Sequence, residues 1–147
     1  MTDRAQKPAR RRQDQWGRAN PAARAVVASH DPGVLTLAES VVSGLGYRVT
    51  TTTVGLGVVE HLGPGPLRAV GPDRIGLLVL DGSAQPWVAL SLVEGLRSAQ
   101  RQLPVVVIMN RDCELDARAE RLGAVAILRL PVASEALERC VRTLVNR

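Results

Sequence analysis

The chain has 147 residues, 46% of them hydrophobic and 2% aromatic, and its formal net charge is +5. This length favours a single domain that buries roughly two-thirds of its unfolded surface. The scarcity of aromatic residues argues against a stacking platform for single-stranded nucleic acid. Because no stretch approaches a membrane span of about 18 apolar residues and no signal-peptide core is present, we expect a cytoplasmic protein without a membrane span.

The excess positive charge is confined to the start of the chain. Residues 1–24 carry seven of the 19 Lys and Arg residues but two of the 14 acidic residues, so the remainder is neutral. Residues 1–23 show no apolar periodicity, and we expect a disordered basic tail there, followed by one domain over 24–147. Any contact with nucleic acid would come from Arg10, Arg11 and Arg12. Trp16 is unusual in such a tail and would anchor it to the domain or to a partner.

The first half of the domain predicts two strands and two helices. A short apolar run over residues 23–29 is typical of a buried strand. Asp31 and Pro32 are a good N-cap and first-turn pair for the helix that follows, which Gly44 and Gly46 end. Residues 47–54 are β-branched and alternating, which indicates a second strand. Residues 55–62 form a weak short helix, and a loop rich in Gly and Pro covers 63–73.

The second half repeats this alternation three times. The predicted strands cover Ile75 to Leu80, where Asp81 follows at once, then residues 103–109 and 124–130. The predicted helices cover about 87–102, 112–122 and 134–145. Strand and helix thus alternate five times, and right-handed crossovers make this an α/β fold. We expect a flavodoxin-like doubly wound sheet of five parallel strands in the order 2-1-3-4-5, with helices on both faces.

The order of these segments resembles the receiver domain of bacterial two-component response regulators. The resemblance covers about residues 24–146. It depends on "HDPGVLTLAESVVSGLGYRV" for the first helix and second strand, on "LLVLD" for the strand with the phosphorylated aspartate, and on "LPVVVIM" for strand four. "RLGAVAILRLPVASEALERCVRTLV" is similar to strand five, the proline after it and the last helix. The resemblance places Asp81 at the phosphoacceptor position.

The residues that assist phosphotransfer in that family are missing from the aligned positions. Receivers hold Mg²⁺ with three carboxylates so that it neutralises the phosphoryl oxygens. Here Ser29 and His30 replace two of the acids. Asp31 falls one place later, where the family often caps a helix.

The other two family positions are also changed. Leu130, before Pro131, stands in place of the clamping lysine, and the neighbouring Arg129 should point to the other side of the strand. The hydroxyl residue that ends strand four becomes Met109, or Asn110 if the register slips by one. We therefore interpret Asp81 and these positions as a vestigial phosphoacceptor site, with no catalytic residues and no metal.

The leading hypothesis is an atypical receiver that signals through protein contacts without phosphorylation, needs no cofactor and is not an enzyme. Its partner would be another protein or a second copy, bound through the fourth helix, fifth strand and fifth helix. Because the chain ends after the last helix, we expect it to act on a partner or to be part of a longer chain. Two alternatives stay open. One is a phosphorylatable single-domain regulator that binds Mg²⁺ through Asp31 and Asp81, and the other is a flavodoxin-like domain that binds a small ligand.

Three further residues have simpler interpretations. Cys113 and Cys140 form no CxxC pair and are expected to be small buried hydrophobic residues. His61, next to Glu60 in the weak helix, has no ligand set around it in the sequence and is expected to be solvated or half-buried.

Overall fold

The computed structural model describes residues 23–62, 75–98, 103–111 and 125–145. The predicted tail up to residue 22, the loop at 63–73, the helix at 112–122 and Cys113 therefore lie outside the described residues. Ala23 is buried, and its main-chain oxygen accepts a hydrogen bond from the Arg48 N–H (3.1 Å). The first strand is thus tied to the second from its first residues.

The described elements follow the predicted order closely. The strands are β1 (Arg24–Ala28), β2 (Arg48–Thr52), β3 (Ile75–Asp81), β4 (Val105–Met109) and β5 (Val125–Arg129). The helices are α2 (Pro32–Gly44), α3 (Leu56–Leu62), α4 (Pro86–Ser98) and α6 (Ser134–Val145). The weak helical pattern at 55–62 is a helix, and the last helix has the predicted bounds.

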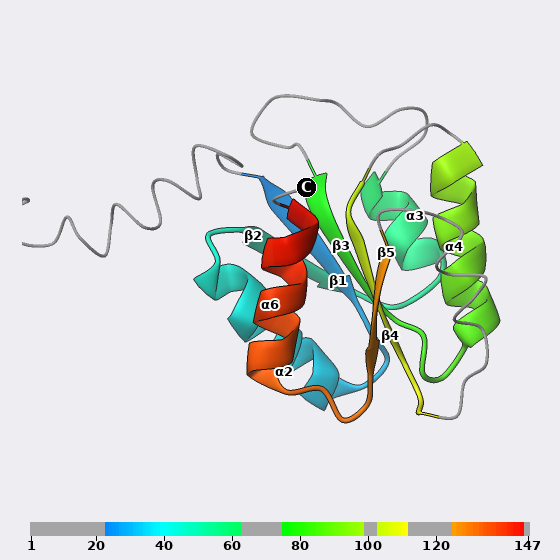
Figure 1. The fold of residues 1–147 in the computed structure, drawn as a ribbon. Coiled ribbons are helices and arrows are strands. Elements are labelled where there is room, and N and C mark those ends of the chain that lie inside the picture. Colours follow the sequence, from blue (N-terminus) through cyan, green and yellow to red (C-terminus); the bar gives the residue numbers. More distant parts are fainter. Residues whose placement is uncertain (1–22, 63–74, 99–102, 112–124, 146–147) are drawn as a thin grey trace, which may run out of the picture.

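The five strands form one parallel sheet in the order β2-β1-β3-β4-β5. The predicted order is therefore confirmed, as are helices on both faces of the sheet (Figure 1). All strands run the same way, so their carboxyl ends meet at one edge, which we call the carboxyl edge. In open α/β sheets this edge is where binding sites form.

Two apolar clusters hold the helices to the sheet. On one face α3 and α4 pack through Val58, Ala89, Leu90 and Val93. On the other face α2 and α6 pack through Ala38, Val42, Leu137 and Val141. The central strands β1, β3 and β4 contribute buried side chains to both clusters, which explains their nearly continuous aliphatic sequences.

Local sequence signals set the ends of α2. Asp31 is the N-cap, and its Oδ1 accepts a hydrogen bond from the N–H of Gly33 (2.8 Å), as expected for an Asp before Pro. At the other end Leu45 caps the helix, and Gly46 has a φ of 101°, a conformation that favours glycine. The predicted cap and stop signals therefore act as expected.

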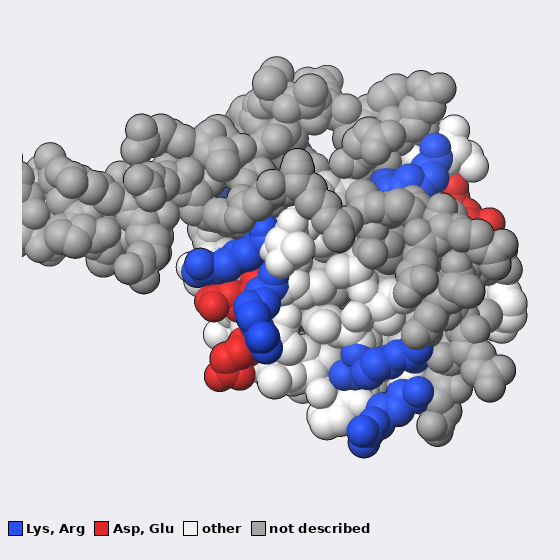
Figure 2. Space-filling view, in the orientation of Figure 1, with Lys and Arg blue, Asp and Glu red and all other residues white. Residues whose placement is uncertain are grey.

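The described surface carries mixed charge. Over α6, blue and red side chains lie next to each other in Figure 2, and Arg142 pairs with Glu138 at 3.9 Å. Within the part of the chain that the structure describes, no helix combines the length and the apolar character needed to cross a membrane.

Candidate functional site

The candidate site lies where β1, β3 and β4 end. Asp81 is the last residue of β3 and pairs in register with Ile108 of β4. On its other side Ala28 pairs with Leu80, so Ser29, the next residue of the chain, lies beside Asp81. These two are the buried polar residues of the described chain, with exposed fractions of 1% for Ser29 and 4% for Asp81. Polar groups this deep need hydrogen-bond partners.

The sheet directs both side chains to the same face. Side chains alternate along a strand, and Ala25 and Val27 pack on the α2 and α6 side, as do Leu77 and Val79. Ser29 continues the first series and Asp81 the second. Both therefore face α2 and α6, which brings a hydroxyl group and a carboxylate together.

The contact between them is a short, charge-assisted hydrogen bond. The Ser29 Oγ donates to Asp81 Oδ2 at 2.6 Å, which lies in the range of strong O–H···O⁻ bonds. The same Oγ accepts from the N–H of Asp31 at 2.9 Å and lies 3.3 Å from the Asp31 main-chain oxygen, so the carboxylate is the closer of its two acceptors. The Ser29 hydroxyl group thus takes part in hydrogen bonds both as an acceptor and as a donor to Asp81.

The second oxygen of Asp81 is bound by the loop that follows it. The N–H of Ser83 donates to Asp81 Oδ1 at 2.9 Å. Ser83 was not among the predicted site residues. An Asp side chain that accepts a hydrogen bond from the main-chain N–H two residues later is nevertheless common in turns. Both carboxylate oxygens therefore have a donor without a metal or a cation.

Gly82 allows this loop to lie close to the sheet. Its N–H donates to the Ile108 oxygen at 2.7 Å. A Cβ at this position would lie 3.1 Å from the Ala89 Cβ and 3.4 Å from the Ile108 oxygen. Close packing thus favours glycine directly after Asp81, because a side chain there would displace its neighbours by a few tenths of an ångström.

The other two predicted residues at the end of β1 lie outside this pair. His30 is exposed, and among the described residues the donors to the Asp81 carboxylate are Ser29 and Ser83, not His30. Asp31 is also exposed, and its Oδ1 serves the helix cap. Of Ser29, His30 and Asp31, only Ser29 therefore binds the Asp81 side chain.

At the end of β4, Met109 and Asn110 were the two candidates for the position of the family's hydroxyl residue. Met109 is fully buried and packs in the cluster beneath α3 and α4, on the face away from Asp81. The Asn110 Nδ2 donates to the Ser83 oxygen at 2.7 Å. Asn110 therefore stands on the side of the Asp81 loop and links that loop to β4.

The end of β5 places an aliphatic residue on the Asp81 face. Leu130 packs with the α2 and α6 cluster, and its N–H donates to the Met109 oxygen (2.9 Å). The Leu130–Pro131 peptide bond is cis. By alternation Arg129 belongs to the opposite face, as expected, and its NH1 donates to the Asn110 oxygen at 2.6 Å. The guanidinium group of Arg129, next to Leu130 in the chain, thus binds a main-chain oxygen.

Comparisons with solved structures agree with the topology. The Francisella response regulator 1452 receiver domain superimposes with a TM-score of 0.68 at 17% identity, over 85% of this chain and 98% of that chain. A response regulator receiver protein from Burkholderia phymatum gives 0.65 at 22% identity, over 84% and 95%. A putative pilus assembly-related protein from Burkholderia pseudomallei gives 0.63 at 25% identity, over 84% and 90%.

No protein-family model matches the sequence, and no curated protein does. The three-dimensional similarity nevertheless covers nearly the whole of each receiver domain. The chain therefore has the fold of the response-regulator receiver domain, with Asp81 at the carboxyl edge where the resemblance places the phosphoacceptor.

The residues around Asp81 do not fit the magnesium ion that receivers bind. Mg²⁺ requires several oxygen ligands, normally including carboxylates, in octahedral geometry. Among the described residues, the groups that bind the Asp81 carboxylate are the Ser29 hydroxyl and the Ser83 N–H, and Leu130 packs on the same face of the sheet. Across the described ranges no three His, Cys, Asp or Glu side chains group together as a metal site would need. The donor set therefore suits a carboxylate held by hydrogen bonds.

Proposed function

We propose that this chain is a receiver-type signalling module that acts through protein contacts and without phosphorylation of Asp81. The observation that carries the proposal is the pairing of both Asp81 oxygens, one with the Ser29 hydroxyl and one with the Ser83 N–H. A carboxylate that accepts two such bonds is stabilised in its charged form without a metal or a clamping cation. It is a module for recognition and not an enzyme.

Phosphotransfer to Asp81 would have to proceed without charge neutralisation. The phosphoryl group carries its charge on three oxygens, and enzymes and receivers neutralise it with a metal and a cation. At Asp81 the Ser29 hydroxyl replaces an acidic ligand and Leu130 replaces the cation. The attacking oxygen would also lose its 2.6 Å hydrogen bond.

The hydrogen bonding of the loop after Asp81 is another reason to expect that this loop keeps one conformation. The resemblance implies that receivers have a hydroxyl residue at the end of strand four as a partner of the phosphorylated aspartate. In this chain Asn110 already bonds to the Ser83 oxygen at 2.7 Å with Asp81 unmodified. Signalling would then depend on which partner is bound, with the loop conformation unchanged.

The proposed partner is a protein, bound on the face that includes β5 and α6. Figure 2 supports a polar surface here, with opposite charges side by side over α6. The same mixed charge gives no support to binding of nucleic acid by the domain. We propose that the protein acts in the cytoplasm.

Acetyl phosphate or beryllofluoride with Mg²⁺ tests the proposal. Wild-type protein is expected to show no added phosphoryl group by mass spectrometry and no chemical-shift changes around Asp81. The control is a rebuilt variant, Ser29→Asp with His30→Asp and Leu130→Lys, which restores the acids and the cation. It should respond if the assay works, once circular dichroism confirms its fold.

A mass increase in the wild type that Asp81→Asn abolishes would instead establish the phosphorylatable alternative. A thermal-shift screen of nucleotides and flavins addresses the third hypothesis. We expect no stabilisation there, and a clear shift would favour a domain that binds a small ligand.

A further inference from the structure

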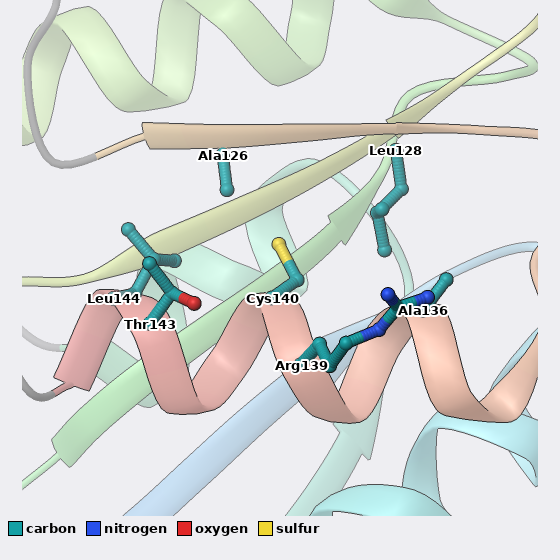
Figure 3. A pocket seen from close by; sticks show the side chains of 7 residues that line it. All are labelled: Ala126, Leu128, Ala136, Arg139, Cys140, Thr143 and Leu144. Carbon is teal, nitrogen blue, oxygen red and sulfur yellow. The ribbon is translucent and has the colours of Figure 1, made fainter.

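A hollow among the described residues runs between β5 and α6. Its volume is about 380 Å³, and seven residues line it: Ala126, Leu128, Ala136, Arg139, Cys140, Thr143 and Leu144. Figure 3 shows the Cys140 sulfur and the Leu128 side chain pointing into the space between the strand and the helix. We call this space the β5–α6 groove. It is apolar along its floor, with Arg139 and Thr143 on its exposed side.

The β5–α6 groove is suited to bind one large side chain, and its surroundings do not suit the broad apolar contact of a stable dimer. The charged residues Glu135, Glu138, Arg139 and Arg142 of α6 are exposed, and one of them, Arg139, lines the rim of the groove. The large hydrophobic residues that are exposed in the described chain lie elsewhere, at Leu56, Val59, Trp87 and Val88 on α3 and α4. A stable dimer would bury about 800 Å² on each copy with an apolar centre. An apolar hollow rimmed by charge instead fits a single aromatic anchor.

The chain itself contains a candidate for such an anchor. Trp16 is the one aromatic residue of residues 1–22, which carry six Lys and Arg residues and two acidic residues. Because β1 and α6 run in opposite directions, Leu144 lies toward the amino edge of the sheet, where β1 begins (Figure 1). Fully extended, the chain between Trp16 and Arg24 could span at most roughly 25–30 Å at about 3.3–3.6 Å per residue. β5 lies three strands from β1 in the sheet, or about 14 Å at about 4.8 Å per strand, and α6 is about 18 Å long at about 1.5 Å per residue. These two distances at right angles combine to about 23 Å, which is within the span of the extended chain.

We propose that the indole of Trp16 docks in the β5–α6 groove of its own chain. Burial of an aromatic ring supplies most of the stabilisation in such anchors. Asp14 precedes Trp16 by two residues, and it would lie near Arg139 on the rim, which adds charge complementarity. The tail would thereby occupy a face on which a protein partner is expected. The inference concerns the resting chain and does not depend on the proposed independence from phosphorylation.

The reactivity of the Cys140 thiol tests the docking directly, since Cys140 lines the groove and is half-buried. The Cys113→Ser background leaves Cys140 as the single thiol. In this background, Trp16→Ala and removal of residues 1–22 should each raise the rate of reaction with a thiol reagent several-fold. The increase should not depend on protein concentration. Equal rates in all three proteins would overturn the proposal.

Fluorescence of Trp16 provides a second readout that does not use the cysteine. Trp87→Phe leaves Trp16 as the only tryptophan, and its emission should be that of a shielded indole. In that background Thr143→Arg at the groove rim should shift the emission to the red, whereas Ser91→Arg on the exposed side of α4 should not. Emission typical of a solvated indole, or identical spectra for both variants, would contradict docking in the groove. Shielding that disappears on dilution would assign the groove to the tail of a second copy and overturn the intramolecular form.

Discussion

The hydroxyl of Ser29 lies 2.6 Å from a carboxylate oxygen of Asp81, 52 residues further along the chain. The contact joins the ends of two neighbouring strands and satisfies a carboxylate that is almost completely buried. An acidic residue in place of Ser29 would repel Asp81 unless a cation lay between them. The serine therefore removes the repulsion that makes receiver sites dependent on metal.

Replacement of Ser29 by alanine should destabilise the domain. The carboxylate of Asp81 would lose its hydroxyl donor while it remains buried, and we expect a loss of about 1–3 kcal/mol in the free energy of unfolding. Urea denaturation measures this loss. Ser40→Ala, on the exposed side of α2, removes the same hydroxyl group without a buried partner and should change stability by less than about 0.5 kcal/mol. Equal effects of the two substitutions would contradict the role assigned to Ser29.

Replacement of Asp81 by asparagine should be tolerated. The amide keeps the size of the side chain, can accept from Ser83 through its oxygen and can donate to the Ser29 Oγ. We expect a stability change of less than about 2 kcal/mol and unchanged partner capture in a pull-down. If the variant folds but no longer binds its partner or no longer functions in cells, the negative charge of Asp81 is needed and phosphorylation-independent signalling is refuted.

Millimolar Mg²⁺ should not raise the melting temperature of the wild-type domain. A ligand stabilises the folded state only where a site exists, and the groups around Asp81 supply one carboxylate. Differential scanning fluorimetry with and without Mg²⁺ tests this. The rebuilt variant with Ser29→Asp, His30→Asp and Leu130→Lys should be stabilised by Mg²⁺. A rise in the wild type that Asp81→Ala abolishes would show that a metal binds.

Replacement of two glycines by alanine should change the stability of the domain in opposite directions. Gly82→Ala places a Cβ 3.1 Å from Ala89, so the loop or α4 must shift, and we expect a loss of about 1–3 kcal/mol. Gly95→Ala adds a Cβ with nothing within 4 Å in the middle of α4 and should stabilise by about 0.5–1 kcal/mol. Thermal unfolding of both variants gives the comparison. Stabilisation by Gly82→Ala would show that the loop after Asp81 is not tightly packed.

The sequence by itself determined the fold and the chemical types at the site. The alternation of apolar runs with helical periodicity predicts the strands and helices, because buried parallel strands and amphipathic helices have different periods. Right-handed crossovers between successive strands then predict the parallel sheet and its order. The pattern also places Asp81 at the end of a strand and shows Ser29, His30 and Leu130 where receivers have acids and lysine. These are local properties, and they do not depend on how one strand lies against another.

The tertiary structure decided which of these residues meet. Ser29 and His30 are adjacent in the chain, yet of the two only Ser29 bonds to Asp81. Ser29 continues the side-chain alternation of β1 toward α2 and α6, whereas His30 lies exposed in the bend before α2. The same rule separates Met109, in the core beneath α3 and α4, from Asn110, which bonds to the Asp81 loop. A register shift of one residue exchanges these roles, and the register is fixed by packing of the whole core. Contacts across 52 residues are therefore set by the packed sheet, which no local stretch of sequence specifies.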